Sequence, residues 1–357
     1  MNSFMIPLAI LILLSGCCAA LGQRRLVFSF TTLFPIVLIV GLSLGSLMSP
    51  APINRIFLSG LFGYAAFSLI QGHTSGVRRT VSLVQLGIIA FLTILSPFLG
   101  TSFTSFASIF VAMSLLPIVP LHVPFVSVVS SAQGTLSGLW VVVFLALGLT
   151  EFVYIHQSIP AVIQSALPFL ALFSAGIISL TCLGHYDIPH ILAHAVVAHI
   201  ALFWGLQPVF LDVIPWSLPF VMIVALALSG WLLAHDSIRQ RYGWHALGQL
   251  PGLADPMPRL GVLVTLLTGI TTMLPILPIL WGVTSMPIIN TLDAPIMVIS
   301  LTILAIWLPG SWYFSRLLHH TMFGKARPHI PYTDLEVSEA CSLVLIIMGA
   351  GFLGVFF

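Results

Sequence analysis

Two short stretches, SLLPIVPLH (residues 114–122) and TMLPILPIL (residues 272–280), each place two prolines three residues apart inside an apolar run. Proline lacks a backbone N–H and its ring clashes with the preceding turn, so it interrupts the hydrogen bonding of a helix. We therefore expect interrupted helices at Pro117 and Pro120, and again at Pro275 and Pro278. Paired interrupted helices in two halves of a chain are typical of transporters built from repeats. The alternative is two ordinary proline kinks.

The composition places these prolines in a membrane. Of the 357 residues, 59% are hydrophobic and 6% are charged, whereas soluble domains contain about 25% charged residues. Alternating strand patterns are absent, and about 20 apolar residues span a bilayer as a helix. A third break is expected in the eleventh span, at Pro309 and Gly310. The sequence predicts an all-α polytopic membrane bundle with about twelve spans, near residues 4–21, 27–48, 55–71, 81–99, 101–121, 136–157, 163–184, 189–207, 213–234, 261–285, 294–318 and 338–357.

The basic residues support this count because they fall on one side of the predicted membrane. Ten of the eleven Lys and Arg residues lie in, or at the edge of, connections that follow odd-numbered spans, and Arg55 is the exception. Basic connections mark the cytoplasmic or matrix side. We therefore expect both termini on the opposite side and the following connections on the basic side: 22–26, 72–80, 235–260 and 319–337.

The polar parts of the sequence limit the chemistry. The longest polar stretches, 235–259 and 319–337, are too short to fold alone, which excludes a Rossmann domain, a P-loop or a flavin site. No cofactor is therefore expected. LSGC at residues 14–17 resembles a lipoprotein signal, but no basic residue precedes Arg24, so an ordinary first span is favoured over cleavage. The cysteines lack metal-site spacing and are expected to be buried apolar residues: Cys17, Cys18, Cys182 and Cys341.

Four blocks resemble, in order, hallmark segments of the antiporter-like proton-pumping subunits of respiratory complex I, which are related to Mrp antiporter and hydrogenase membrane subunits. PLHVPFVSVVSSAQGTLSGLWVVVFLALGLTEFVYI (120–155) is similar to the segment where Pro-x-His-x-Trp-Leu-Pro leads into a Leu-Lys-x-Gly helix. HYDIPHILAHAVVAHI (185–200) is similar to Asp-Leu-Lys-Arg-Leu-Ile-Ala-Tyr-Ser-Ser-x-Ser-His. LPGLADPMPRLGVLVTLLTGITTMLPILPILWG (250–282) and MFGKARPHIPYTDLEVSEACSLVLII (322–347) resemble the family's Met-Pro and Phe-Gly segments. Residues 115–357 are thus expected to form an antiporter-like domain, and residues 1–114 show only matching hydropathy.

The departures from the family's pattern bear on function. The resemblance implies a row of buried lysines and glutamates that moves protons across the membrane. This chain instead has Ala146 at the lysine of Leu-Lys-x-Gly, Pro189 and His190 at Lys-Arg, and Val283 at the later glutamate. No acidic residue precedes Glu151, and the single lysine lies in a polar connection. We therefore expect this chain to conduct protons weakly or not at all.

The histidine-rich stretch at 185–200 is best explained as a rewritten form of the family's motif. Asp187 is expected to cap the next helix, with Pro189 in the first turn, where no backbone donor is needed. His190 and His194 are four residues apart and share a helix face, as metal ligands do. At about 100° per residue, however, His199 points nearly opposite to His190.

A metal or haem would therefore need His122 or His235 from another helix, and no metal site is expected. Hydrogen-bonded core histidines and a histidine proton relay both remain open. Glu151 lies inside the sixth span, where a carboxylate is costly unless it is paired or protonated. It is either a proton carrier or an acid that reaches the polar boundary. The proton-path candidates are Glu151, His122, His190, His194 and His199.

Two classes of function remain. In the first, the chain is a structural or weakly conducting membrane-arm subunit of a complex I-like assembly, such as an NADH:quinone oxidoreductase, with no catalytic site of its own. In the second, it is an autonomous or paired cation/proton transporter, of the Mrp or inorganic-carbon-uptake type, that uses His side chains and Glu151. The missing lysines favour the first. We expect other membrane subunits and lipids as partners, no nucleic acid, and a bacterial or mitochondrial inner membrane as the location.

Overall fold

The computed structural model describes residues 2–23, 30–50, 52–72, 76–98, 101–156, 159–207, 214–243, 246–278, 280 and 293–356. Every named element in these ranges is a helix, which confirms the predicted all-α class. The described helices are α1 (Asn2–Leu21), α2 (Phe30–Met48), α3 (Ile53–Gln71), α4 (Val77–Leu95), η1 (Ser96–Phe98), α5 (Thr101–Leu115), α6 (Val123–Ser131), α7 (Leu136–Ile155), α8 (Ala161–Gly184), α9 (Ile188–Leu206), α10 (Ile214–Tyr242), α11 (Pro258–Met273), α13 (Asp293–Met322) and α14 (Val337–Phe356).

The helices match the predicted spans in number and order. Within the described residues, nine helices are long and apolar enough to cross a membrane, and three shorter apolar helices lie in α2, α5 and α11. Together they fall one on each of the twelve predicted spans. Two helices run well past their predicted ends: α10 continues to Tyr242 and α13 to Met322, beyond the predicted ends at 234 and 318. Charged side chains in their last turns hid these helical residues from a pattern based on hydrophobicity.

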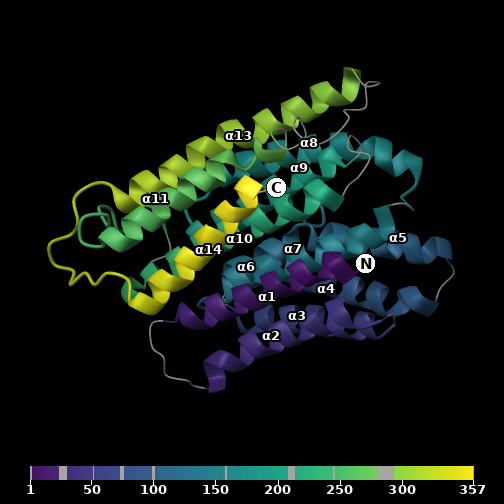
Figure 1. Ribbon diagram of the computed structural model, residues 1–357, viewed down its shortest axis with the longest axis horizontal. Coiled ribbons are helices and arrows are strands. Elements are labelled where there is room, and N and C mark those ends of the chain that lie inside the picture. Colours follow the sequence, from purple (N-terminus) through teal and green to yellow (C-terminus); the bar gives the residue numbers. More distant parts are fainter. Residues whose placement is uncertain are drawn as a thin grey trace.

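The helices pack side by side along the long axis of the molecule (Figure 1). α9 and α10 form the centre, because 94% of each apolar window is buried, and α7 joins them with 89%. In contrast, only 28% is buried in α3, α4 and α14, which leaves most of their apolar surface facing outward. α1 to α4 form one flank and α8, α11 and α13 the other (Figure 1).

Outward-facing apolar surface extends to two of the cysteines. Cys18 and Cys182 are buried as expected, but Cys17 and Cys341 are exposed. The expectation that all four are buried was therefore wrong for these two. Apolar side chains on the outside of a membrane bundle face lipid, so hydrophobicity does not separate core from surface there.

The two proline pairs interrupt their helices, as predicted. α5 ends at Leu115 and α6 begins at Val123, so Pro117 and Pro120 lie in the break. α6 itself lies in a stretch predicted to be a connection. In the second half, α11 ends at Met273 and residues 274–276 form a turn around Pro275, with Pro278 just beyond it.

The third predicted break, at Pro309 and Gly310, was wrong. α13 runs through both residues without interruption. A lone proline removes one backbone donor, and α1, α2, α8 and α10 also continue through single prolines. Two prolines three residues apart remove two nearby backbone donors, and this distinguishes the two real breaks from the continuous helix at Pro309.

α7 packs unusually closely against the first break, and Gly148 makes this possible. A Cβ at this position would lie 2.8 Å from the backbone nitrogen of Leu116 and 2.9 Å from the carbonyl carbon of Leu115. Backbone atoms cannot move aside as the tip of a side chain can. Glycine at 148 is thus required by the contact between α7 and the end of α5.

We predict that Gly148→Ala destabilises the protein by roughly 1–3 kcal/mol, because the added methyl overpacks this contact. Gly87→Ala in α4 is the matched control, since a Cβ there meets nothing within 4 Å. It should be neutral or stabilising by up to about 1 kcal/mol, because alanine restricts the unfolded chain. Thermal unfolding in detergent measures both variants, and equal stability of the two would contradict this account.

The described basic residues, except Arg55, gather at one end of the bundle. Arg78 and Arg79 begin α4, Arg241 ends α10, and Arg259 begins α11. The segments that carry them contact one another at this end. Leu247 N–H donates to Tyr186, Gly252 N–H donates to Phe323, and Arg259 N–H donates to the Asp334 carboxylate. We call this the basic end.

Candidate functional site

The first helix break is satisfied by side chains of α8 and α9. In a continuous helix the carbonyl of Leu116 would accept from the N–H of residue 120, but Pro120 has none. The buried indole Nε1–H of Trp204, in α9, donates to this carbonyl at 3.0 Å. The backbone N–H of Val119 donates to the hydroxyl of Ser174, in α8, at 3.2 Å. Broken backbone is tolerated at membrane depth only where protein or water supplies such partners.

We predict that Trp204→Phe destabilises the protein by about 1–3 kcal/mol, because it leaves a buried carbonyl without its donor. Trp231→Phe is the matched control. Trp231 is also buried, but its indole N–H has no hydrogen-bond partner among the described residues. Its replacement should be neutral or slightly stabilising. Urea-induced unfolding in detergent compares the two, and a loss of similar size in both would contradict the capping role of Trp204.

The second helix break lies beside His199, also in α9. Pro275 has no N–H to offer the carbonyl of Thr271, and the Thr271 backbone lies close to the His199 ring. The Nδ1–H of His199 donates to the carbonyl of Ala195 at 2.7 Å, and Nε2 is buried without a hydrogen-bond partner among the described residues. A neutral ring with this tautomer presents only an acceptor at Nε2. α9 therefore places a polar side chain at each break.

Four other histidine rings gather near the basic end, and we call them the histidine cluster: His122, His185, His190 and His194. His185 stacks on His194, with ring centroids 4.9 Å apart, and on His190 at 5.7 Å. His122, at the start of α6, lies 6.4 Å from His194. Sequence reasoning selected three of these histidines but passed over His185, although it opens the same histidine-rich stretch.

His199 stays apart from the histidine cluster. It packs against Phe314 of α13 at 6.2 Å between ring centroids. This separation agrees with the helical geometry expected from the sequence. Of the described residues, no group of three or more His, Cys, Asp or Glu is arranged to hold a metal ion. The stacked rings present faces to one another, whereas ligands must point ring nitrogens at a common centre.

The start of α9 differs in one detail from the expectation. Asp187 is at the N-cap position and Pro189 is in the first turn, as predicted. However, the Asp187 side chain makes no cap hydrogen bond to the backbone and instead accepts from Nδ1 of His190. Pro189 has no N–H to be capped, which leaves the carboxylate for the imidazole. Capping by the side chain was therefore wrong, although the helix start was right.

The surroundings of His185 disfavour its charged form. This residue lies in the connection between α8 and α9, outside the membrane-spanning segments. Burial lowers its pKa from the ordinary value, the charges of His190 and Arg78 lower it further, and Asp187 opposes them. A neutral ring can stack closely on its neighbours without charge repulsion.

Glu151 has a buried partner in the sequence-distant Arg55. A guanidinium nitrogen of Arg55, in α3, lies 2.6 Å from Oε2 of Glu151 in α7, and the side chains are only 13% and 5% exposed. The pair joins residues 96 positions apart. The pair also explains the exception in the distribution of basic residues. Arg55 is the one Lys or Arg predicted to lie on the opposite side of the membrane from the other ten, and it has a buried acidic partner there. Glu151 lies near the end of α7 and is paired there.

We predict that Glu151→Leu costs about 3 kcal/mol of stability, because it leaves the Arg55 guanidinium buried without its counter-charge. The double variant Arg55→Met/Glu151→Leu should regain most of this loss, since no unpaired charge is left. A double-mutant cycle on thermal unfolding in detergent measures the coupling. Additive losses in the double variant would show that the two side chains do not act as a pair.

A second buried ion pair holds the basic end together. Arg241 at the end of α10 donates two parallel bonds to Glu339 in α14, one of them 2.7 Å long, and each side chain is 1% exposed. Glu339 also accepts from the N–H of Glu336 at 2.7 Å. Sequence reasoning placed Arg241 in a connection and missed this pair. The sequence feature that could have predicted this pair is an acidic residue in the first turn of one apolar helix together with a basic residue in the last turn of another.

The centre of α7 is apolar. Ala146, which was expected to match a lysine of the antiporter-like motif, is buried, and so are its neighbours Leu145 and Leu147. Val283, which was expected to match a later glutamate, lies outside the described residues. The geometry thus defines an α-helical membrane bundle with two interrupted helices and its buried charges paired at the ends of helices.

The fold is similar to that of chains in two energy-coupling assemblies. The chain matches a chain of respiratory complex I from Thermus thermophilus with a TM-score of 0.79 and 17% identity, over 100% of this chain and 81% of that one. It matches a chain of the Mrp complex from Dietzia sp. DQ12-45-1b with a TM-score of 0.67 and 14% identity, over 94% and 68%. In sequence it matches no family model and no curated protein.

These likenesses confirm the predicted antiporter-like fold. The likeness to the complex I chain includes residues 1–114, where the sequence showed only matching hydropathy. At these identities the comparisons define the fold, and function has to be argued from the residues.

Proposed function

We propose that the chain is a membrane-arm subunit of a multisubunit energy-coupling assembly of the complex I type or a relative, and that it conducts protons weakly or not at all. The observation that carries the proposal is the combination of both helix breaks with an apolar centre. Trp204 caps the Leu116 carbonyl at the first break and His199 lies beside Thr271 at the second, while the position expected to match a proton-carrying lysine is the buried Ala146.

The positions of the buried acids support weak conduction. Among the described residues, the buried carboxylates are Glu151, Asp236 and Glu339. Glu151 pairs with Arg55, Asp236 accepts from Gln240 at 2.5 Å, and Glu339 pairs with Arg241. All three lie within about two turns of a helix end. A proton path across the membrane needs proton-carrying side chains near its midplane, and none of these three acids lies in the middle of its helix.

The histidines make an incomplete path. Among the described residues, no hydrogen bond joins one ring of the histidine cluster to another, and Nδ1 of His194 donates to the carbonyl of His190. His199 lies on a different face of α9. Water molecules between rings would be needed for transfer, since protons move along hydrogen bonds. The second candidate, an autonomous transporter based on Glu151 and His side chains, therefore has less support.

The orientation follows from the charges. The basic end should face the cytoplasm or the matrix, by the positive-inside rule. Both termini would then lie on the opposite side, in a bacterial or mitochondrial inner membrane. Other membrane subunits would cover part of the apolar outer surface, and lipids the rest.

Purification from native membranes provides the material for the test. We expect the chain to co-purify with a fixed set of membrane subunits, because the proposal makes it one part of an assembly. A chain that purifies alone and transports cations when reconstituted would contradict the proposal and support the autonomous transporter.

In the purified assembly, Glu151→Gln should leave the number of protons pumped per turnover unchanged. The amide keeps a hydrogen-bond acceptor for Arg55 but cannot carry a proton at ordinary pH. Asp255→Asn, at an exposed acid, is the matched control and should behave in the same way. Reconstituted vesicles with a pH-sensitive dye measure the stoichiometry. A loss of roughly one proton per turnover in Glu151→Gln alone, with assembly intact, would show that Glu151 is a carrier.

A further inference from the structure

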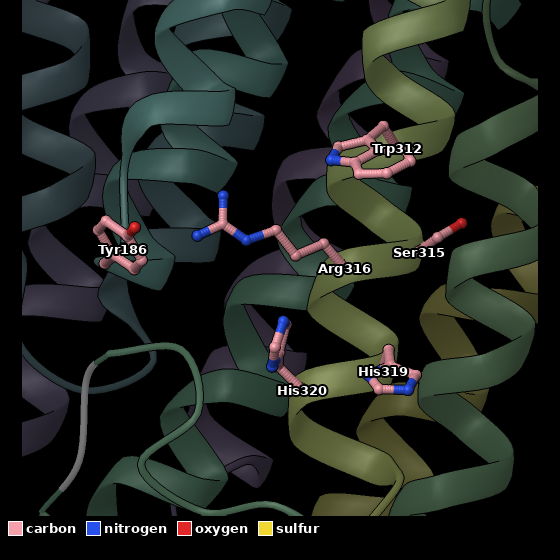
Figure 2. A pocket seen from close by; sticks show the side chains of 6 residues that line it. All are labelled: Tyr186, Trp312, Ser315, Arg316, His319 and His320. Atoms are coloured by element: carbon pink, nitrogen blue, oxygen red, sulfur yellow. The ribbon is translucent and has the colours of Figure 1, made fainter.

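A groove of about 530 Å³ opens on the side of the bundle, between the last turns of α13 and the connection from α8 to α9. Its lining combines one arginine, two histidines, two aromatic residues and a serine: Arg316, His319, His320, Tyr186, Trp312 and Ser315. In Figure 2, Arg316 extends from α13 toward Tyr186, with Trp312 on one side of the arginine and His320 on the other.

The guanidinium of Arg316 is held in place but retains free donors. One of its nitrogens donates to the carbonyl of Leu183 at 2.7 Å, and the group lies 4.9 Å from the centroid of the Tyr186 ring. A guanidinium has five N–H donors, and these contacts occupy few of them. The remaining N–H groups are therefore available for a ligand in the groove.

In the part of the chain that the structure describes, no carboxylate pairs with Arg316. The acid nearest in sequence to the groove lining, Asp187, accepts from His190 instead. An uncompensated arginine in a partly buried groove favours an anion, and its planar fork suits a phosphate or carboxylate.

An apolar stripe leads from the groove along the same helix. Leu301, Leu304, Leu308 and Trp312 of α13 are all exposed and are spaced three or four residues apart, so they share one face. The stripe ends at Ser315, Arg316 and His319. It is apolar along about three turns and polar at the basic end. This is the pattern of an amphiphile that lies along the helix with its headgroup in the groove.

We propose that this groove binds the phosphate of an anionic phospholipid, with an acyl chain lying along the α13 stripe. Basic pockets between membrane helices on the cytoplasmic or matrix side are suited to anionic headgroups. Trp312 and Tyr186 are exposed aromatic residues, and such rings prefer the depth at which headgroups meet the hydrocarbon. Free phosphate could bind Arg316 but would make no contact with the apolar stripe.

The test uses the full-length chain in the assembly with which it purifies, in detergent micelles supplemented with phosphatidylcholine. Phosphatidylglycerol, phosphatidylcholine and inorganic phosphate are the probes, and native mass spectrometry and the shift in melting temperature are the measurements. We expect phosphatidylglycerol to be retained and to stabilise the protein. Inorganic phosphate should do neither, because it lacks the acyl chain.

Arg316→Gln should weaken phosphatidylglycerol binding by about tenfold or more, because a charge-assisted hydrogen bond is lost. Arg327→Gln is the control, since it removes an equal charge from the exposed segment after α13. Equal binding by the two variants would overturn the proposal. Inorganic phosphate that protects as well as the lipid would overturn the lipid assignment, and so would a partner subunit that fills the groove and excludes lipid.

A second pair of variants guards against misfolding, because Arg316 also bonds to Leu183. His320→Glu places a negative charge at an exposed position in the groove, and His329→Glu does so at an exposed position outside it. His320→Glu should reduce phosphatidylglycerol retention without changing the melting temperature in phosphatidylcholine alone. Retention equal to that of His329→Glu would count against the groove as the binding site.

Discussion

The structure depends on finding hydrogen-bond partners for backbone that two prolines have removed from a helix. In hydrocarbon, an unsatisfied carbonyl costs several kcal/mol, so a broken helix is stable only next to a donor. α9 supplies the donor at the first break, where Trp204 bonds to the Leu116 carbonyl, and it places His199 beside Thr271 at the second. This explains why α9 is central and almost completely buried, and why α7 needs Gly148 to approach the first break. The interrupted helices and the buried core therefore depend on each other.

The buried charges, like the broken backbone, are stabilised by polar partners. Each buried acid among the described residues has a polar partner, and each lies near a helix end, where water or headgroups are within reach. The middle of α7 contains only apolar side chains around Ala146. A scaffold that resembles those of complex I and Mrp chains is thus combined with a membrane core that has few ionisable groups. The fold persists without them because packing and backbone satisfaction hold it together.

The sequence predicted the fold well because its main signals are local. Apolar length located the twelve segments, and paired prolines located the breaks. The lone proline at 309 was misjudged because one lost hydrogen bond leaves a helix intact. The partners of the candidate residues could not be predicted, since they depend on tertiary contacts. Nothing near Glu151 in the sequence indicates Arg55, and nothing near Pro120 indicates Trp204.

The pairing of Arg55 with Glu151 has a consequence for how the chain is made. A ribosome adds Arg55 to the growing chain 96 residues before its partner. During that interval α3 carries an uncompensated guanidinium on the side that the other basic residues avoid. The charge of Arg55 is therefore balanced only once α7 enters the membrane, and α7 then contacts α1, α2, α5 and α6 as well. Assembly of the amino-terminal half is thus completed by its seventh helix, which delivers the missing negative charge.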